Sequence, residues 1–273
     1  MHPKENKWKL SPTPLSNKVL KEVDNIIAID ETGTPTLKNI DNNTPVSKTW
    51  FGITGIIIDK TTINGIAKDV MDLKEKYWQN GNYNGQRVVF HSRNIRKKEG
   101  AFNPKLINYD DFRNDLNELL SSLPIQVVAT LINKKKHVNK YLYPYPVYSL
   151  SLEFLIERAS YRLNWLGEST ILLLESRGWR EDCALLRQIN SILKNGSRYV
   201  SPDTLKCIKG IYFAKKRTSN RLKSYWPLEL SDMISYRIYS TKTQNKGLKD
   251  FDSIEKLFID YPNYQNKGLK FFP

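Results

Sequence analysis

Apolar residues in this chain gather in short continuous runs that alternate with longer stretches, where they recur every three or four positions. The short runs are typical of strands buried on both faces, and the longer stretches are typical of amphipathic helices. The predicted strands cover residues 24–30, 49–58, 87–91, 125–132, 169–174 and 206–213. The predicted helices cover residues 62–79, 108–122, 147–165, 180–194 and 227–241. This alternation predicts a mixed α/β domain.

The order of the predicted elements narrows the fold class. When residues 60–122 are set aside, the order is two strands, a third strand, helix, strand, helix, strand, helix. This is the order of a ribonuclease H-like core with an α-rich insertion between its second and third strands, although other α/β folds can be trimmed to match it. We therefore expect a polar arm over residues 1–22 and one ribonuclease H-like domain over 23–273, a mixed sheet flanked by helices, with a tail at about 242–273.

Charge is the most informative feature of the composition. Lysine and arginine number 43 against 28 acids, which gives a net charge of +15. Such an excess favours an anionic partner, and nucleic acid is the commonest one, while a basic surface without a ligand is the alternative. No apolar run approaches the roughly 20 residues of a membrane span, so no membrane association is expected. The polar N-terminus predicts no signal peptide, and the two cysteines predict no disulfide framework, so we expect a cytoplasmic location.

Acidic residues interrupt apolar segments at three places. Asp30 and Glu31 directly follow the run of the first strand, and Glu175 directly follows the run at 169–174. Open α/β sheets place ligand sites at the carboxyl ends of such strands. Asp232 lies inside the last predicted helix, which is apolar on nearly every side, so its carboxylate has little access to water.

Converging carboxylates need either a bound proton on one of them or a cation between them. Two of them about 4 Å apart repel by roughly 4 kcal/mol at an effective dielectric constant near 20. Oxygen ligands suit Mg²⁺ or Mn²⁺, and a pair of such ions can hydrolyse a phosphodiester bond. We therefore predict that Asp30, Glu175 and Asp232 ligate two metal ions, with Glu31 as an outer or alternative ligand. Each acid also has a simpler interpretation: Asp30 as a turn cap, Glu175 as an ion-pair partner of a nearby arginine, and Asp232 as a hydrogen-bonded buried acid.

Two further residues are candidates for catalysis. Glu157 lies beside the apolar stripe of the predicted helix 147–165 and could supply a fourth carboxylate, while the alternative is a surface pair with Arg158 or Arg162. His91 follows a predicted strand and precedes a basic segment, so it could move a proton or contact the scissile phosphate. A hydrogen bond from His91 to a backbone carbonyl is the alternative.

Basic residues cluster beside the predicted acids. The densest cluster, at 215–226, lies between the last core strand and the last helix, and a second cluster follows His91. Such clusters hold phosphate groups in nucleic-acid-binding proteins, while solvated mobile loops are the alternative. The predicted phosphate-binding residues are Arg93, Arg96, Arg177, Lys215, Lys216 and Arg217.

Short motifs in this order resemble one family. The sequence is similar to the family known as domain of unknown function 3800, which is regarded as ribonuclease H-like. The similar segments are IDETG at 29–33, FHSRNIRKKEGAF at 90–102, the stretch 133–158, ESRGWREDCAL at 175–185, LELSDMISYRI at 228–238 and GLKFFP at 268–273. Two positions depart from the family pattern: Thr32 stands for a serine, and Asn94 stands for an acid, so Asn94 receives no metal-binding role.

The resemblance implies a metal-dependent nuclease whose metal-binding set is Asp30, Glu175 and Asp232. It also implies a connection to phage defence or mobile elements, where a protein partner is expected. A catalytically silent nucleic-acid-binding or adaptor subunit with the same fold is the second hypothesis, and a phosphotransfer or structural RNA-binding role is the third. The choice between DNA and RNA, and the oligomeric state, stay open.

Overall fold

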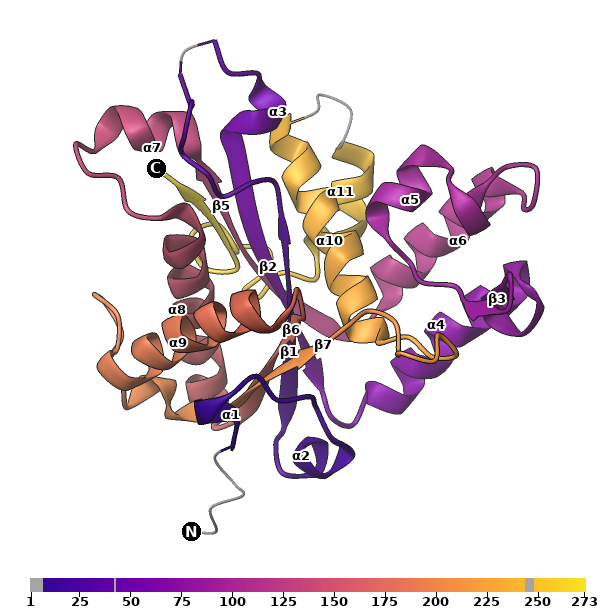
Figure 1. Cartoon of the computed structure of the whole chain (residues 1–273), viewed down its shortest axis with the longest axis horizontal. Coiled ribbons are helices and arrows are strands. Elements are labelled where there is room, and N and C mark those ends of the chain that lie inside the picture. Colours follow the sequence, from indigo (N-terminus) through magenta and orange to yellow (C-terminus); the bar gives the residue numbers. More distant parts are fainter. Residues whose placement is uncertain (1–6, 42, 244–247) are drawn as a thin grey trace.

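The computed structural model describes residues 7–41, 43–243 and 248–273, which form a mixed sheet with helices on both faces (Figure 1). The strand order is β7-β6-β1-β2-β5-β8. β2 is antiparallel to both β1 and β5, whereas β1 and β6, β6 and β7, and β5 and β8 run parallel. The strand bounds are β1 Asn25–Thr32, β2 Trp50–Asp59, β5 Ile125–Asn133, β6 Thr170–Glu175, β7 Ile208–Ala214 and β8 Leu269–Phe272.

The central strands are buried over most of their length, as their continuous apolar runs predict. The residues from Asn25 to Asp30 are all buried, and so are those from Phe51 to Ile58. Both faces are covered because α10 (Trp226–Thr243) packs against β1 and β2, and α8 (Val147–Leu166) packs against β2 and β5. Figure 1 shows α10 and α11 on one side of the sheet, with α8 and α9 on the other.

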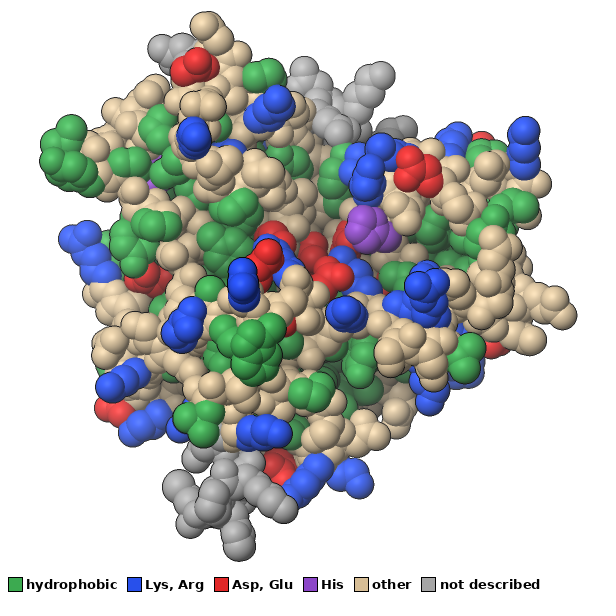
Figure 2. All heavy atoms as spheres, in the orientation of Figure 1, with side chains coloured by type: hydrophobic (Ala, Val, Ile, Leu, Met, Phe, Trp, Pro, Cys, Tyr) green, Lys and Arg blue, Asp and Glu red, His purple; other side chains and the backbone are tan. Residues whose placement is uncertain are grey.

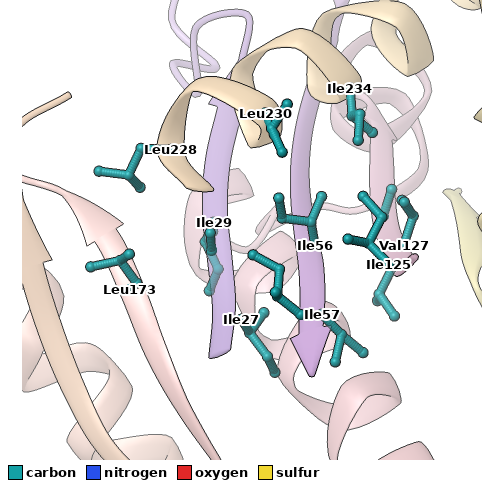
Figure 3. Close-up of a cluster of buried hydrophobic side chains, with 14 of the residues drawn as sticks. Ile27, Ile29, Ile56, Ile57, Ile125, Val127, Leu173, Leu228, Leu230 and Ile234 are labelled. Carbon is teal, nitrogen blue, oxygen red and sulfur yellow. The ribbon is translucent and has the colours of Figure 1, made fainter. Parts of the chain in front are cut away.

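The core between α10 and the sheet is built from branched aliphatic side chains. Figure 3 shows Leu230 and Ile234 pointing from α10 toward the sheet, where Ile56 is supplied by β2. All three side chains are fully buried. This layer fixes α10 over β1, and it therefore fixes where along β1 any polar residue of α10 lies.

The region between β2 and β5 forms a helical lobe beside α10 (Figure 1). Its elements are α4 Ile63–Tyr77, η1 Gln79–Gly81, the two-stranded sheet of β3 Asn82–Tyr83 and β4 Gln86–Arg87, α5 Ser92–Lys97, η2 Gly100–Phe102 and α6 Tyr109–Ser122. Trp78, Phe90, Phe102 and Phe112 pack as an aromatic cluster inside the lobe, with ring centroids 5.4–6.5 Å apart. The predicted helices at 62–79 and 108–122 are confirmed as α4 and α6.

Two predictions for this lobe are wrong. Residues 88–91 are not a strand, and the basic segment that follows contains helix α5 instead of a loop. The backbone N–H of Phe90 donates to the Glu229 carboxylate of α10 at 2.6 Å, and the N–H of Val88 donates to the carbonyl of Gly81. Val88 and Phe90 are buried inside the lobe: the Val88 bond extends the β3–β4 pairing by one residue, whereas the Phe90 donor bonds to a side chain.

Both ends of the described chain pack on the sheet. The N-terminal part contains α1 Lys7–Leu10 and α2 Asn17–Lys21; α1 lies beside β7 with Trp8 buried, and Phe213 of β7 donates to the carbonyl of Thr13. At the other end, α11 Leu248–Glu255 packs on α10, and β8 adds a sixth strand that the sequence pattern did not predict. The remaining helices are α3 Val46–Thr49, α7 Lys134–Lys140, α9 Trp179–Asn195 and η3 Thr204–Cys207. No described helix is long and apolar enough to span a bilayer.

Candidate active site

Three acidic side chains that are distant in sequence meet at one end of the sheet. β1 and β6 run parallel with Ile29 opposite Leu174, so Asp30 and Glu175 follow at the same level on neighbouring strands. Asp232 reaches the same place from α10, and a 2.7 Å hydrogen bond between the hydroxyls of Thr32 and Ser235 joins the strand and the helix about one turn further on. Figure 2 shows acidic side chains gathered in the middle of this face, with lysine and arginine side chains around them.

The three carboxylates share one lysine. The Lys216 Nζ atom lies 2.6 Å from Asp232 Oδ2, 2.9 Å from Glu175 Oε2 and 3.5 Å from Asp30 Oδ1. Lys216, Asp30 and Asp232 are buried, while the Glu175 side chain keeps 33% of its surface exposed. Lys216 was predicted to hold phosphate at the surface; instead it neutralises part of the negative charge at the centre of the site.

One ammonium does not balance three carboxylates, and the pKa values reflect this. Burial raises the pKa of Asp30 to about 7, with further increases from Asp232 and Glu175, although Lys216 opposes the effect. Burial also disfavours ionised Asp232, but Lys216 and His91 hold its pKa below the ordinary value. Burial lowers the pKa of Lys216, but the three carboxylates raise it more, so its ammonium stays charged. The site therefore carries excess negative charge at neutral pH.

His91 and Ser92 approach the site from the helical lobe. The backbone N–H of Ser92 donates to Asp232 Oδ1 at 3.1 Å, and His91 Nε2 lies 3.6 Å from Asp232 Oδ2. The His91 side chain is 40% exposed, while its Nδ1 is buried without a hydrogen-bond partner. His91 is thus the predicted site residue that touches both solvent and the carboxylate centre.

A second buried ion pair lies about one turn earlier on α10. Lys74 of α4 bonds to both carboxylate oxygens of Glu229 at 2.7 and 2.8 Å, and both side chains are fully buried. Glu229 also accepts the N–H of Phe90, and Asp232 accepts that of Ser92, so α10 holds the backbone on both sides of His91. The sequence analysis missed this pair, although Lys74 lies on the apolar stripe of its helix, four residues after Val70, which is an unusual place for an unpaired lysine.

Glu31 and Arg177 form an ion pair beside the centre. Glu31 follows Asp30 but, by the alternation of a strand, points to the other face, where it pairs with Arg177. Asp182, at the start of α9, accepts the backbone N–H of Arg177 at 2.9 Å and the hydroxyl of Ser176 at 2.7 Å, and so fixes the segment after Glu175. Glu31 therefore stands next to the carboxylate centre, and Asp182 is a positioning residue that sequence reasoning missed.

The structure does not bring Glu157 to this site. Glu157 is buried, accepts a hydrogen bond from the Ser197 hydroxyl and lies 3.8 Å from Arg158. Tyr148, on the same helix, contributes to the surroundings of Glu175 and Arg177. Nine residues along a helix correspond to about 13 Å, which separates Glu157 from that end. The alternative interpretation is a surface pair with Arg158 or Arg162; Arg158 is its neighbour, but Glu157 is buried and does not lie on the surface.

The other predicted phosphate-binding residues lie in different environments. Arg93 and Lys215 are exposed next to His91 and Lys216 in sequence. Arg96 is exposed and stacks on the ring of Tyr236, with its guanidinium carbon 3.6 Å from the ring centroid. Arg217 donates to Gln86 at 2.9 Å and so joins the segment after β7 to the helical lobe. Arg93, Arg96, Lys215 and Arg177 remain accessible to a phosphate.

The donor set suits a hard divalent cation. Within residues 7–41, 43–243 and 248–273, no group of three or more His, Cys, Asp or Glu side chains has an arrangement that could hold a metal ion as it stands. The Lys216 ammonium lies among the three carboxylates that would be the ligands. Their oxygen atoms and excess charge fit Mg²⁺ or Mn²⁺, because such ions prefer carboxylate ligands.

Comparisons with known proteins give no match: no family model, no curated protein and no solved structure matches this chain. The resemblance to the family known as domain of unknown function 3800 stays a prediction from its motifs. The function is therefore argued from the geometry of the carboxylate centre.

Proposed function

We propose that this chain is a metal-dependent nuclease that hydrolyses phosphodiester bonds of DNA or RNA. The observation that carries the proposal is the meeting of Asp30, Glu175 and Asp232, from β1, β6 and α10, around one cation. Three carboxylates at a partly exposed point, surrounded by basic residues, are an arrangement suited to metal-assisted cleavage of a polyanion.

The topology supports a ribonuclease H-like assignment. Without the region between β2 and β5, and with the short helices α3, α7 and η3 and the two ends of the chain left aside, the elements follow in the order β1, β2, β5, α8, β6, α9, β7, α10, which is the order expected from the sequence. The carboxylates lie at the end of β1 and β6 where parallel strands finish, which is the usual ligand-binding edge of such sheets.

Asp30, Glu175 and Asp232 would hold Mg²⁺ or Mn²⁺, and we favour two bound ions. The metal would activate water and stabilise the leaving oxygen. Lys216 neutralises part of the carboxylate charge and would have to yield part of its contacts when another cation binds. Ser92 fixes the orientation of Asp232 through its backbone N–H. Glu31 and Asp182 keep Arg177 beside the centre, where Arg177 can bind a phosphate group.

His91 is suited to move a proton near the scissile phosphate. It is the histidine beside Asp232, it reaches solvent, and its neighbour in the chain is held by the same carboxylate. Its Nε2 lies 3.6 Å from Asp232 Oδ2, so this ring nitrogen faces the carboxylate centre where a proton would be moved. The exposed cations Arg93, Arg96 and Lys215 would hold the strand on both sides of the centre.

A silent nucleic-acid-binding or adaptor subunit is the second candidate. The observation that favours it is Lys216, which already neutralises part of the acidic charge without a metal ion. Under either function, a phage-defence or mobile-element setting with a protein partner is part of the proposal, as is a cytoplasmic location.

The decisive experiment compares Asp30→Ala with the parent chain on single-stranded, double-stranded and hybrid substrates. Mn²⁺, Mg²⁺ and EDTA are tested side by side. We expect metal-dependent cleavage by the parent and a loss of at least about 100-fold in Asp30→Ala, because the metal loses a ligand. Asp203→Ala is the matched control, since this exposed acid pairs only locally with Lys206 and lies away from the site.

Binding measured in EDTA separates the two candidates. Asp30→Ala should bind the substrate within about threefold of the parent, because phosphate contacts come from the basic residues. Cleavage by Asp30→Ala at the parental rate would overturn the metal-site assignment. The adaptor would be established instead if the parent and its variants bind tightly without cleavage and Mn²⁺ leaves the melting temperature unchanged.

A further inference from the structure

A second cavity lies on the outer face of α8, away from the carboxylate centre. Its volume is about 540 Å³, which is within the usual range for small-molecule sites. α8 lines it with residues at positions 154, 157, 158, 161, 162 and 165, spaced as one face of a helix. The opposite wall comes from the segment 259–270, which includes β8.

Aromatic rings are exposed at this cavity to an unusual degree. Trp165 is 77% exposed, Tyr199 is 64% exposed and Tyr161 is 53% exposed, although all three line the same hollow. The Tyr161 hydroxyl donates to the backbone carbonyl of Tyr199 at 2.8 Å, which holds the Tyr161 ring against the segment that carries Tyr199. Exposed rings held in place offer a flat surface on which an aromatic ligand can stack.

Cations lie beside these rings. The Arg162 guanidinium carbon lies 5.2 Å from the Trp165 ring centroid, and Lys270 Nζ lies 4.5 Å from that of Phe154. Arg158 and Lys267 also line the cavity, so four cations face two acids, Glu157 and Asp260. Lys267 lies 3.8 Å from Asp260 and Arg158 lies 3.8 Å from Glu157, which leaves Arg162 and Lys270 as the net positive charge.

One polar group in the wall has an unused bonding capacity. Arg158 Nε is buried and makes no hydrogen bond with another described residue, whereas its Nη1 donates to the carbonyl of Phe154 at 2.9 Å. A buried donor without a partner is costly unless a ligand or water satisfies it. The cavity therefore combines stacking surfaces, net positive charge and an unsatisfied guanidinium.

We propose that this cavity binds a nucleotide, with the base stacked on Trp165 and Tyr161 and the phosphate held by Lys270 and Arg162. A purely apolar ligand would leave the cations unpaired, and inorganic phosphate would leave three exposed rings without a role. The nucleotide can be free or part of a single strand, since both present the same base and phosphate. The site uses none of the residues of the proposed nuclease centre and goes beyond that function.

Binding of adenosine monophosphate and of a short single-stranded oligoadenylate to the full chain in EDTA tests the proposal. Calorimetry should show saturable binding of at least one probe, and Trp165→Ala and Lys270→Gln should each weaken it by about 10-fold. Tyr143→Ala and Lys209→Gln are matched controls, because both residues are exposed and lie outside the cavity. Melting temperatures of the variants establish that they are folded.

The outcomes distinguish the source of the ligand. Stronger binding of the mononucleotide identifies a free nucleotide, and stronger binding of the oligomer that Trp165→Ala and Lys270→Gln both weaken identifies a strand. Equal affinity in Trp165→Ala, Lys270→Gln and the parent, or binding of inorganic phosphate that is as tight as that of either probe, would overturn the proposal. Asp30→Ala should bind both probes like the parent, so failure of the nuclease proposal leaves this one intact.

Discussion

Helix α10 carries two acids, Glu229 and Asp232, that each bind a buried lysine, and the two ion pairs differ in balance. Lys74 meets Glu229 alone, both side chains are fully buried, and Ser224 accepts a further bond from Lys74 at 3.0 Å. Lys216 meets Asp232 together with Asp30 and Glu175, and the last of these is partly exposed. The first pair is closed and neutral, whereas the second has more negative than positive charge.

This difference separates a structural ion pair from a candidate site. A balanced buried pair has its charges and hydrogen bonds satisfied, so it contributes by joining α4 to α10. At the other pair, burial raises the pKa of Asp30 to about 7, with smaller increases from Asp232 and Glu175, and the surplus carboxylate charge leaves a demand for a further cation. Surplus charge with access to solvent is therefore the property that distinguishes the candidate site at the end of β1 from the structural pair.

The largest effect is expected from breaking the closed pair. Lys74→Met leaves the Glu229 carboxylate buried without a counter-ion, so the free energy of unfolding should fall by about 3–5 kcal/mol, measured by urea denaturation. Mn²⁺ should not restore it, because a single buried carboxylate makes a poor metal site. The double variant Lys74→Met/Glu229→Gln should recover most of the loss, since the charge is gone and Phe90 keeps an acceptor. A loss below about 1 kcal/mol would contradict this account.

A smaller loss is expected from Lys216→Met. In EDTA the free energy of unfolding should fall by about 2–3 kcal/mol, less than for Lys74, because Glu175 is partly solvated and Asp30 can take up a proton. Mn²⁺ should restore stability in this variant, since a bound ion at 100 times its Kd contributes about 2.7 kcal/mol. Thermal melting with and without Mn²⁺ is the measurement. Equal responses to Mn²⁺ in Lys216→Met and Lys74→Met would remove the distinction between the two sites.

Asp30→Asn should have the smallest effect, with the opposite sign. The pKa of Asp30 is 3.8 before folding and about 7 afterwards, so the folded state binds the proton more tightly. Stability from this group therefore falls as pH rises from about 4 to 7 and is constant above. Replacement by neutral asparagine removes this penalty, so the variant should exceed the parent by about 1–3 kcal/mol at pH 8 in EDTA, and by less at pH 5. A variant that is less stable than the parent at pH 8 would show that Asp30 is ionised without cost.

Much of the fold could be predicted from local patterns. The run at 24–30 is confirmed as β1 and the run at 169–174 as β6, because strands buried on both faces need continuous apolar sequence. Residues 88–91 look similar but are not a strand, because the N–H of Phe90 bonds to the Glu229 side chain instead. β8 was missed because a four-residue strand at a sheet edge has almost no periodicity of its own.

The candidate site, like the fold, could be predicted from local sequence only in part. Asp30 and Glu175 could be predicted because each ends an apolar run, and parallel neighbours finish at the same edge. The position of Glu157 could not be predicted. The sequence shows that Glu157 lies beside the apolar stripe of α8, but it does not show how far this part of α8 lies from the carboxyl ends of the strands. Lys216 stands in a basic cluster in sequence, and nothing local distinguishes it from Lys215, which is exposed.

The sequence by itself determined the alternation of strands and helices, the basic surface and the acids at the ends of buried runs, because each depends on neighbours within a few positions. Tertiary structure decided which lysine enters the carboxylate centre, that α4 is joined to α10 through Lys74, and that an aromatic and cationic cavity forms beside α8. The physical reason is that burial and charge pairing depend on contacts between segments as far apart as 74 and 229. Such contacts are fixed by how helices pack on the sheet and leave no periodic mark in the chain.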